Sequence, residues 1–319
     1  MDADFVERLE RAISLGLERR PGGRPGTGRL RALAADDRGK VGPGAVTYLH
    51  RPHHHRKGIA STANHMIKSI VQFIEAVRTD SSSWRPGEPK WFRGEPNKPM
   101  PLLPTLYREG LADYENPLLQ MFRARASGYH DVVPDRDRTD QWLFLARHAG
   151  LPTRLLDWTE GALIALHFAL KEKEPVVWML NPLELNELAG VPPSVGKFRE
   201  FPLTWVDHSG RNPAFENIAG AWVLDQRGVP LPIAVYPTYV HARLRAQRSC
   251  LTVHGKRKEG LATLVPSTGG ILKRYVVDPD CRPSMITELR SLGVTDSVAF
   301  PDLDGLAKEL KAQFSENRA

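Results

Sequence analysis

The fold prediction starts from one stretch of the sequence, Ala146-Arg147-His148-Ala149-Gly150-Leu151-Pro152-Thr153-Arg154-Leu155-Leu156-Asp157-Trp158-Thr159. A helix predicted over 138–149 ends within it, and a short extended piece then carries Arg154 and Asp157. A second helix, which is apolar nearly all round, is predicted over 160–171. Where a strand runs into a helix, unpaired backbone N–H groups gather, and such a corner suits an anionic group such as a pyrophosphate.

The elements predicted on either side of this stretch place the chain in the α+β class. The other helices are predicted at 67–77 (capped by Thr62 or Asn64), 115–128, 283–292 and 302–315, and the strands at 90–93, 176–180, 232–237, 250–254, 271–277 and 297–300. The region from 190 to 230 is irregular. Helices and strands alternate irregularly, with strands gathered in the second half, which favours α+β over a doubly wound parallel sheet.

The chain begins with two segments that differ from the rest. Residues 1–18 carry an apolar residue every four positions (Phe5, Leu9, Ile13, Leu17), which predicts an amphipathic helix. Residues 19–60 are rich in Gly, Pro and Arg and too poor in apolar residues to pack, so we expect a flexible basic linker. The domain is expected over 61–319.

The net charge of the chain comes from the linker. There are 44 Lys and Arg against 37 Asp and Glu, which gives +7. Residues 19–57 hold ten basic residues against two acidic ones, whereas 58–319 is nearly neutral. The linker ends in the histidine tract His50, His53, His54 and His55, which is typical of a solvated basic segment; the alternative is a segment that binds metal or nucleic acid.

Several classes of protein are excluded or disfavoured by what the sequence lacks. Two cysteines, Cys250 and Cys281, give no disulfide framework and no CxxC metal pair, so no metal site is expected. Acidic residues stand near the N-terminus where a signal peptide would be basic, and no apolar run is long enough for a membrane span. We expect a cytoplasmic protein without a membrane partner. Walker A, GxSxG and HExxH motifs are absent.

Each candidate site residue has a structural and a functional interpretation. Asp157 or Thr159 can cap helix 160–171, and Arg154 can pair with Asp157; both Arg154 and Asp157 can also contact a ligand. His148 near a helix C-terminus either interacts with the helix dipole or takes part in function. Arg93, at the end of a strand, forms a surface ion pair or a cationic clamp for phosphate or carboxylate.

These passages resemble the FRG domain family, named for the Phe-Arg-Gly motif that stands here at Phe92-Arg93-Gly94. The resemblance covers roughly residues 62–315. It is carried by Leu103-Pro104-Thr105-Leu106, by the run from Arg147 to Thr159, by Ala165-Leu166-His167-Phe168-Ala169, by Arg245 to His254 and by Phe300 to Leu306. In its order of motifs the chain is similar to ADP-ribosyltransferases of the arginine type, which implies a mixed or antiparallel split β-sheet core flanked by helices.

The resemblance implies a role for individual residues. Arg93, with Gly94 beside it, would hold the phosphate and ribose of NAD, which is the substrate; Thr159 would support the nicotinamide side and Gln247 would meet the nicotinamide ribose. Since Gln247 is not a carboxylate, Asp157 is the candidate for the negative charge. Gly is common in the family two residues after this Gln, where the chain has Ser249. His148 and Arg154 complete the expected cofactor-binding set.

Three functions remain open from the sequence. The first is an NAD-consuming toxin or antiphage defence effector, either an ADP-ribosyltransferase, which is a glycosyltransferase, or an NAD glycohydrolase, with an unknown macromolecular target. The second is a non-catalytic module that binds a nucleotide or a partner. The third is contact with nucleic acid, or with an antitoxin-like partner, through residues 1–58.

Overall fold

The structure of the protein is a computed structural model. It describes residues 65–99, 101–129, 133–135, 139–189, 203–204, 231–237, 242–255, 257–265 and 270–316. The helix predicted over 1–18, the linker at 19–60 with its histidine tract, and most of the region 190–230 lie outside the described residues.

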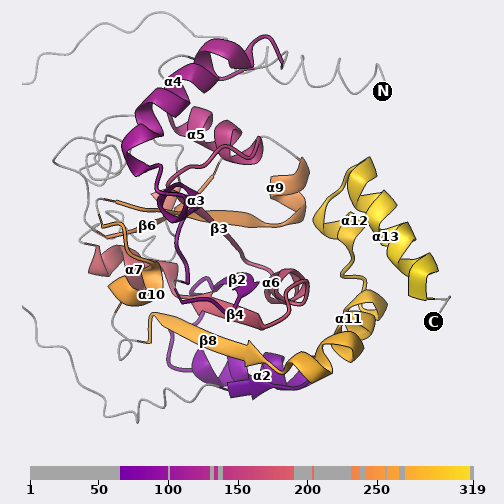
Figure 1. The fold of residues 1–319 in the computed structure, drawn as a ribbon. Coiled ribbons are helices and arrows are strands. Elements are labelled where there is room, and N and C mark those ends of the chain that lie inside the picture. Colours follow the sequence, from indigo (N-terminus) through magenta and orange to yellow (C-terminus); the bar gives the residue numbers. More distant parts are fainter. Residues whose placement is uncertain are drawn as a thin grey trace, which may run out of the picture. The chain divides into compact units, whose positions relative to one another are not determined.

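One mixed sheet forms the centre of the fold, with the strand order β1-β8-β4-β2-β3-β7-β6-β5 (Figure 1). The strands are β1 (His65–Ile67), β2 (Trp91–Pro96), β3 (Leu155–Thr159), β4 (Pro175–Leu180), β5 (Leu203–Thr204), β6 (Ile233–Tyr236), β7 (Ser249–Val253) and β8 (Leu272–Val277). The pairs β1·β8 and β5·β6 are parallel, and the other neighbours are antiparallel. The α+β class and the mixed sheet are therefore as the sequence predicts.

Helices pack on both faces of this sheet. They are α2 (Ile70–Asp80), α3 (Thr105–Arg108), α4 (Glu115–Ala126), α5 (Thr139–His148), α6 (Ala162–Ala169), α7 (Pro182–Leu188), α9 (Ala242–Ala246), α10 (Leu261–Leu264), α11 (Arg282–Ser291), α12 (Asp296–Ala299) and α13 (Leu303–Glu316), with short 3-10 turns at Ala112–Tyr114 and Pro279–Cys281. On one face, α4 and α5 cover β3, β7 and β6, while α2, α6 and α11 cover β1, β8, β4 and β2. On the opposite face lie α7 and α10.

Strand alternation explains these two faces. In β4, Val177 and Met179 pack under α6, whereas Val176, Trp178 and Leu180 pack on the opposite side. β4 is buried at every position, so its sequence is a continuous apolar run instead of an alternating one.

The sheet is nearly divided at its centre. β2 and β3 lie next to each other, but within these two fully described strands only Phe92 and Thr159 pair. By contrast, β2 pairs with β4 along all six of its residues, and β3 pairs with β7 along all five. Beyond this single pair no ladder joins the two strands, and we call this interruption of the sheet the split.

Most of the predicted elements are confirmed within a few residues, and the errors are local. The strand predicted at 297–300 is wrong, because these residues belong to the short helix α12 and its C-terminal end. The predicted caps Thr62 and Asn64 are also wrong, since Ser69 caps α2 by accepting a hydrogen bond from the Gln72 amide. β1, three residues long, gives too short a pattern to be recognised.

Candidate functional site

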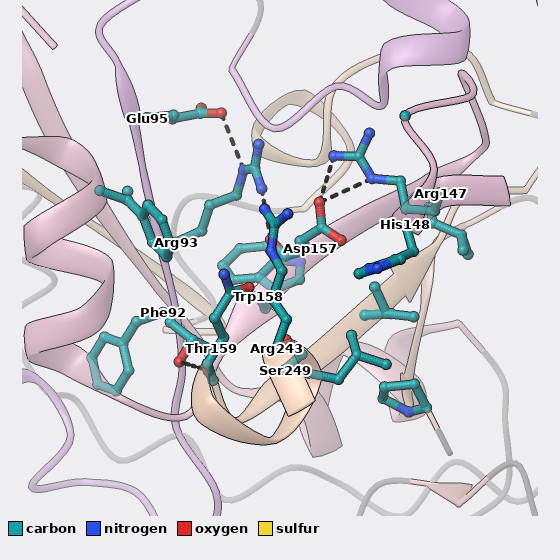
Figure 2. A pocket seen from close by; sticks show the side chains of 18 of the residues that line it. Phe92, Arg93, Glu95, Arg147, His148, Asp157, Trp158, Thr159, Arg243 and Ser249 are labelled. Carbon is teal, nitrogen blue, oxygen red and sulfur yellow. Dashed lines mark hydrogen bonds and ion pairs between the residues drawn. The ribbon is translucent and has the colours of Figure 1, made fainter. Parts of the chain in front are cut away.

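A pocket of about 820 Å³ lies over the split, on the sheet face that α5 and α6 cover (Figure 2). Its lining comes from β2, β3 and β7 of the sheet and from α5, α6 and α9 around it. The volume falls in the range of small-molecule sites, on the order of 300–1,000 Å³. Of the seven predicted site residues, six line this pocket: Arg93, Gly94, His148, Asp157, Thr159 and Gln247.

Arg93 bridges the split. Its Nη1 donates a hydrogen bond of 2.7 Å to the main-chain carbonyl of Asp157, and its Nε lies 3.3 Å from a carboxylate oxygen of Glu95. The Arg93 side chain is 17% exposed, so it is fixed by the protein yet open to the pocket. Arg93 therefore has the acidic partner that one interpretation from the sequence expects, and it also lines a cavity. Its role as a clamp for phosphate or carboxylate stays a prediction.

Glu95 is the buried anchor of this arrangement. Its carboxylate accepts a hydrogen bond of 3.0 Å from the Leu102 amide and lies 2.9 Å from the Lys98 ammonium. Leu102 has a positive φ of 57°, a conformation that is strained for a leucine. The Glu95 carboxylate thus holds Arg93, Lys98 and the loop after β2 together.

Asp157 faces the pocket and pairs with Arg147 of α5. Arg147 Nε donates a hydrogen bond of 3.0 Å to the Asp157 carboxylate, and Nη2 contacts the same oxygen. Burial alone would raise the pKa of Asp157, but the neighbouring cations Arg147, Arg93 and Arg243 outweigh burial and lower it. The carboxylate is therefore ionised at neutral pH.

The predicted capping role of Asp157 is wrong. The N-cap of α6 is Gly161, which has no side chain to bond the helix N–H groups. The hydroxyl of Thr159 accepts a hydrogen bond of 2.9 Å from the Gly161 amide, so Thr159 orders the turn before the helix. Asp157 does not cap the helix, because its carboxylate faces the pocket and pairs with Arg147 of α5.

Arg243 of α9 is the third arginine at Asp157, and the sequence analysis did not single it out. Its guanidinium lies 4.4 Å from the centre of the Phe300 ring, a cation–π contact, and it contributes to the lowered pKa of Asp157. In the part of the chain that the structure describes, Arg243 makes no ion pair with a carboxylate. Figure 2 shows the guanidinium groups of Arg93, Arg147 and Arg243 gathered around Asp157.

The pocket as a whole carries an excess of positive charge. Six of its described lining residues are basic and three are acidic: Arg93, Lys98, Arg108, Arg147, Lys171 and Arg243 against Glu95, Asp157 and Glu172. The domain sequence around it is nearly neutral. The cationic character is thus a local property of the pocket and was hidden in the net charge of the chain.

Thr159 and Gln247 meet across the strand pair β3·β7. The Thr159 hydroxyl donates a hydrogen bond of 2.6 Å to the main-chain carbonyl of Gln247, while the Gln247 side-chain amide donates to the carbonyl of Ala299 at 3.0 Å. Ser249, the first residue of β7, pairs with Thr159. The structure therefore brings the predicted Thr159 and Gln247 together at the end of the pocket next to α6.

Gly94 has a packing role beside Arg93. A Cβ atom at this position would lie 2.0 Å from the carbonyl oxygen of Ala165 and 2.5 Å from the amide nitrogen of Ala169. Only glycine lets α6 approach β2 this closely, and that approach forms one wall of the pocket.

Arg154 does not line the pocket. It is 5% exposed and forms a bidentate ion pair with Glu115, with Nε 2.9 and 2.8 Å from the two carboxylate oxygens. The prediction that Arg154 pairs with Asp157 is wrong, because its partner is Glu115. The predicted part of Arg154 in binding a cofactor stays a prediction, and Arg154 is not among the residues that line this pocket. Arg154 precedes β3, where its side chain points toward α4 and the carbonyl of His254 instead.

The described residues include neither a candidate metal centre nor a candidate membrane span. No group of three or more His, Cys, Asp or Glu residues among them has the arrangement of a metal centre. Likewise, none of the helices found in the described ranges combines the length and the apolar character that a membrane crossing requires.

Comparison with family models identifies the domain. The model of the FRG domain matches residues 88–176, from just before β2 to the start of β4. The chain contains an FRG domain. The match includes Arg93, Gly94, Arg147, His148, Asp157 and Thr159 of the pocket, whereas Arg243 and Gln247 lie beyond it. Comparisons with curated proteins and with solved structures found no significant match.

Proposed function

We propose that the pocket of this FRG domain protein binds NAD and that the protein is an ADP-ribosyltransferase or NAD glycohydrolase. The observation that carries the proposal is the gathering of Arg93, Arg147 and Arg243 around Asp157 in one pocket (Figure 2). These three side chains come from β2, α5 and α9, so the fold itself assembles the cluster.

The charge of this cluster favours a diphosphate. Arg93 pairs with Glu95 and Arg147 with Asp157, whereas Arg243 has no carboxylate partner among the described residues, so the cluster keeps an excess of positive charge. Arginine binds phosphate oxygens in a bidentate geometry. Arg93 and Arg147 are held in place by hydrogen bonds, and Arg243 by an aromatic ring. A preorganised site of this kind does not have to reorganise when the anion binds.

The arrangement of the remaining residues supports the transferase interpretation. The resemblance implies a split sheet with Arg93 on one side, Thr159 at the end of the facing strand, and Gln247 before the next strand. All three line the same pocket over a sheet whose central strands pair at one position only. Their presence in one pocket supports the transferase interpretation.

Cleavage of the bond between nicotinamide and ribose requires little covalent catalysis by the protein. The bond between nicotinamide and ribose breaks with its electron pair going to nicotinamide, and the ribose C1′ passes through an oxocarbenium-like state before an acceptor oxygen, nitrogen or water attacks it. The arginines would hold the diphosphate in place, and the Asp157 carboxylate would supply negative charge near the developing cation. Gln247 offers only a hydrogen bond.

A second candidate, binding without turnover, rests on the partners of Thr159 and Gln247. The Thr159 hydroxyl is engaged by the Gln247 carbonyl and the Gly161 amide, and the Gln247 side chain is engaged by Ala299. Residues held in this way serve the fold, and they contact a ribose only after these bonds rearrange. In both candidates the arginine cluster binds the same diphosphate.

The test uses NAD that carries ³²P in its adenylate phosphate, incubated with the full chain and cell lysate, and measures transfer of the label. Lysate is included because a toxin or defence effector would modify a cellular target. Wild type is compared with Arg93→Gln, Arg243→Gln and Arg125→Gln; Arg125 is exposed on α4 and lies outside the pocket. Label on a lysate component, or loss of NAD, that disappears in the first two variants and persists in the third supports the enzyme. Binding of NAD without either supports the module.

A further inference from the structure

We propose that the end of the pocket at His148 is a nucleobase subsite, so that the ligand is a nucleoside diphosphate whose base lies against the His148 ring. The inference rests on the proposed function in one respect, namely that the arginine cluster binds the diphosphate.

The floor of the pocket has three zones along β3. Leu155, Asp157 and Thr159 all line the pocket, because alternate residues of a strand share one face. On β7, Leu251 pairs with Asp157 and Ser249 pairs with Thr159. The floor therefore changes from apolar at Leu155, through the pair of charged Asp157 and apolar Leu251, to hydroxyl-bearing at Thr159 and Ser249, over about 13 Å.

The walls over Leu155 continue this apolar zone. Phe144 and His148 of α5 line the pocket, and Phe144 and Leu155 belong to the core that α4 and α5 build on the sheet. The His148 side chain itself is exposed. In Figure 2, His148 and Phe92 lie on opposite sides of the group formed by Arg93 and Asp157.

This combination of surfaces fits a base better than an alkyl chain. A flat aromatic ring at the mouth and aliphatic side chains beneath it can enclose a planar ring, and base stacking on histidine is a common mode of nucleotide recognition. Arg147 directly precedes His148, so a group stacked there lies beside the cations that would hold a phosphate. A ring joined to a diphosphate satisfies both zones at once.

The zones also assign the two ends of NAD. The reactive end of the proposed transferase is at Thr159 and Ser249, on the far side of the arginines from Leu155. The base at His148 is therefore the one that stays on the ADP-ribose product, which is adenine, and nicotinamide occupies the Thr159 end. ADP and ADP-ribose should both bind in the His148 subsite.

The test compares the dissociation constants of ADP and inorganic pyrophosphate for the full chain, measured by calorimetry. Wild type should bind ADP about tenfold or more tightly than pyrophosphate, since base stacking on an aromatic side chain contributes on this scale. His148→Ala should lose most of that ratio through weaker ADP binding, with the pyrophosphate constant within about twofold of wild type. His148→Phe, which keeps a flat ring, should restore the ratio, and Arg125→Gln is the control.

Three results would overturn the inference. They are equal affinity of wild type for ADP and pyrophosphate, a His148→Ala variant in which both ligands weaken together, and binding of neither ligand. The last result would remove the diphosphate site as well. If ADP binds through His148 but NAD is neither cleaved nor transferred, the proposed enzyme fails while the base subsite stands.

Discussion

The guanidinium of Arg93 on β2 donates a 2.7 Å hydrogen bond to the main-chain carbonyl of Asp157 on β3. Because the two strands pair only at Phe92 and Thr159, this bond crosses the split where a backbone ladder would otherwise continue. Arg93 therefore links the two parts of the sheet and also lines the pocket between them.

Arg93→Gln and Arg243→Gln should separate these two tasks. Arg93→Gln removes bonds to the Asp157 carbonyl and to Glu95, and we expect a loss of about 2 kcal/mol in the free energy of unfolding measured in urea. Arg243 is held by Phe300 and forms no ion pair among the described residues, so its variant should lose under about 1 kcal/mol. Both variants should bind pyrophosphate about tenfold more weakly. Unchanged pyrophosphate affinity in Arg243→Gln would contradict the cluster.

Arg154 is expected to act on stability alone. Arg154→Met leaves Glu115 buried without its partner, and removing one member of a buried ion pair costs about 3–5 kcal/mol. The double variant Arg154→Met with Glu115→Leu should recover much of the loss, because it leaves no unpaired charge. Urea denaturation measures both, and calorimetry on the folded single variant should give wild-type affinity for pyrophosphate. Affinity lost in the single variant would return Arg154 to the ligand site.

The contrast between Arg154 and Arg147 shows where sequence reasoning stops. Both stand in the quoted stretch, seven residues apart, and nothing local distinguishes a buried ion pair from a pocket lining. Arg154 is turned away from the pocket by Glu115, which is 39 residues distant along the chain. Arg147, at the end of α5, pairs with Asp157 and lines the pocket, and the sequence analysis assigned it no partner.

What the sequence predicted well is what depends on local pattern. The strand at 176–180 and the helix at 115–128 have strong apolar or periodic patterns and appear as β4 and α4. The sequence also singled out the motif residues Arg93 and Asp157. The split of the sheet, across which these two residues are bonded, was implied by the resemblance alone. The sequence could not identify Arg243 as a pocket residue, because its position beside Asp157 depends on how α9 packs against Phe300 at the C-terminal end of α12.

Asp157→Asn should have opposite effects on stability and on anion binding. The lowered pKa of Asp157 means that its ionised form stabilises the fold at pH values above its ordinary pKa near ~3.9, and that this contribution is lost as the pH falls below it. Since 43% of the side chain is exposed, solvent screens the pair, and the loss at pH 7 should stay under about 1 kcal/mol. Pyrophosphate should bind severalfold more tightly, because a negative charge leaves the site.

Urea denaturation at pH 7 and pH 3 and calorimetry at pH 7 check this variant. The stability difference from wild type should shrink at the lower pH. Weaker pyrophosphate binding in Asp157→Asn would show that the carboxylate is needed to orient Arg147, and would count against a cluster that binds through its excess charge.

His254 should make the protein sensitive to acid. Its ring is fully buried, and burial together with the cations Arg154 and Arg93 lowers its pKa to about 3. The unfolded chain takes up a proton near pH ~6.5, so the contribution of neutral His254 is fully present above that pH and is lost progressively as the pH falls toward the folded value. Between these values wild type should lose about 1 kcal/mol per pH unit more than His254→Phe. Parallel stability curves for the two proteins would show that His254 is protonated without cost.

Gly94→Ala tests the wall that α6 forms. The added methyl group would meet the backbone of Ala165 and Ala169, which cannot rotate away, so we expect a loss of about 1–3 kcal/mol and weaker pyrophosphate binding as Arg93 moves with β2. Gly87→Ala offers a comparison, because no atom lies within 4 Å of a Cβ there, although its positive φ adds strain. Thermal unfolding of both variants decides the point; a Gly94→Ala protein as stable as wild type would mean that α6 does not press on β2.

The most direct test of the central claim is release of nicotinamide from NAD, followed by chromatography, with the full chain alone and with cell lysate. We expect wild type and Arg125→Gln to release nicotinamide at the same rate, and Arg93→Gln and Arg243→Gln to release it at least about a hundredfold more slowly, since each loses a preorganised contact to the diphosphate. No release by wild type under either condition, or equal release by Arg93→Gln, would contradict the account.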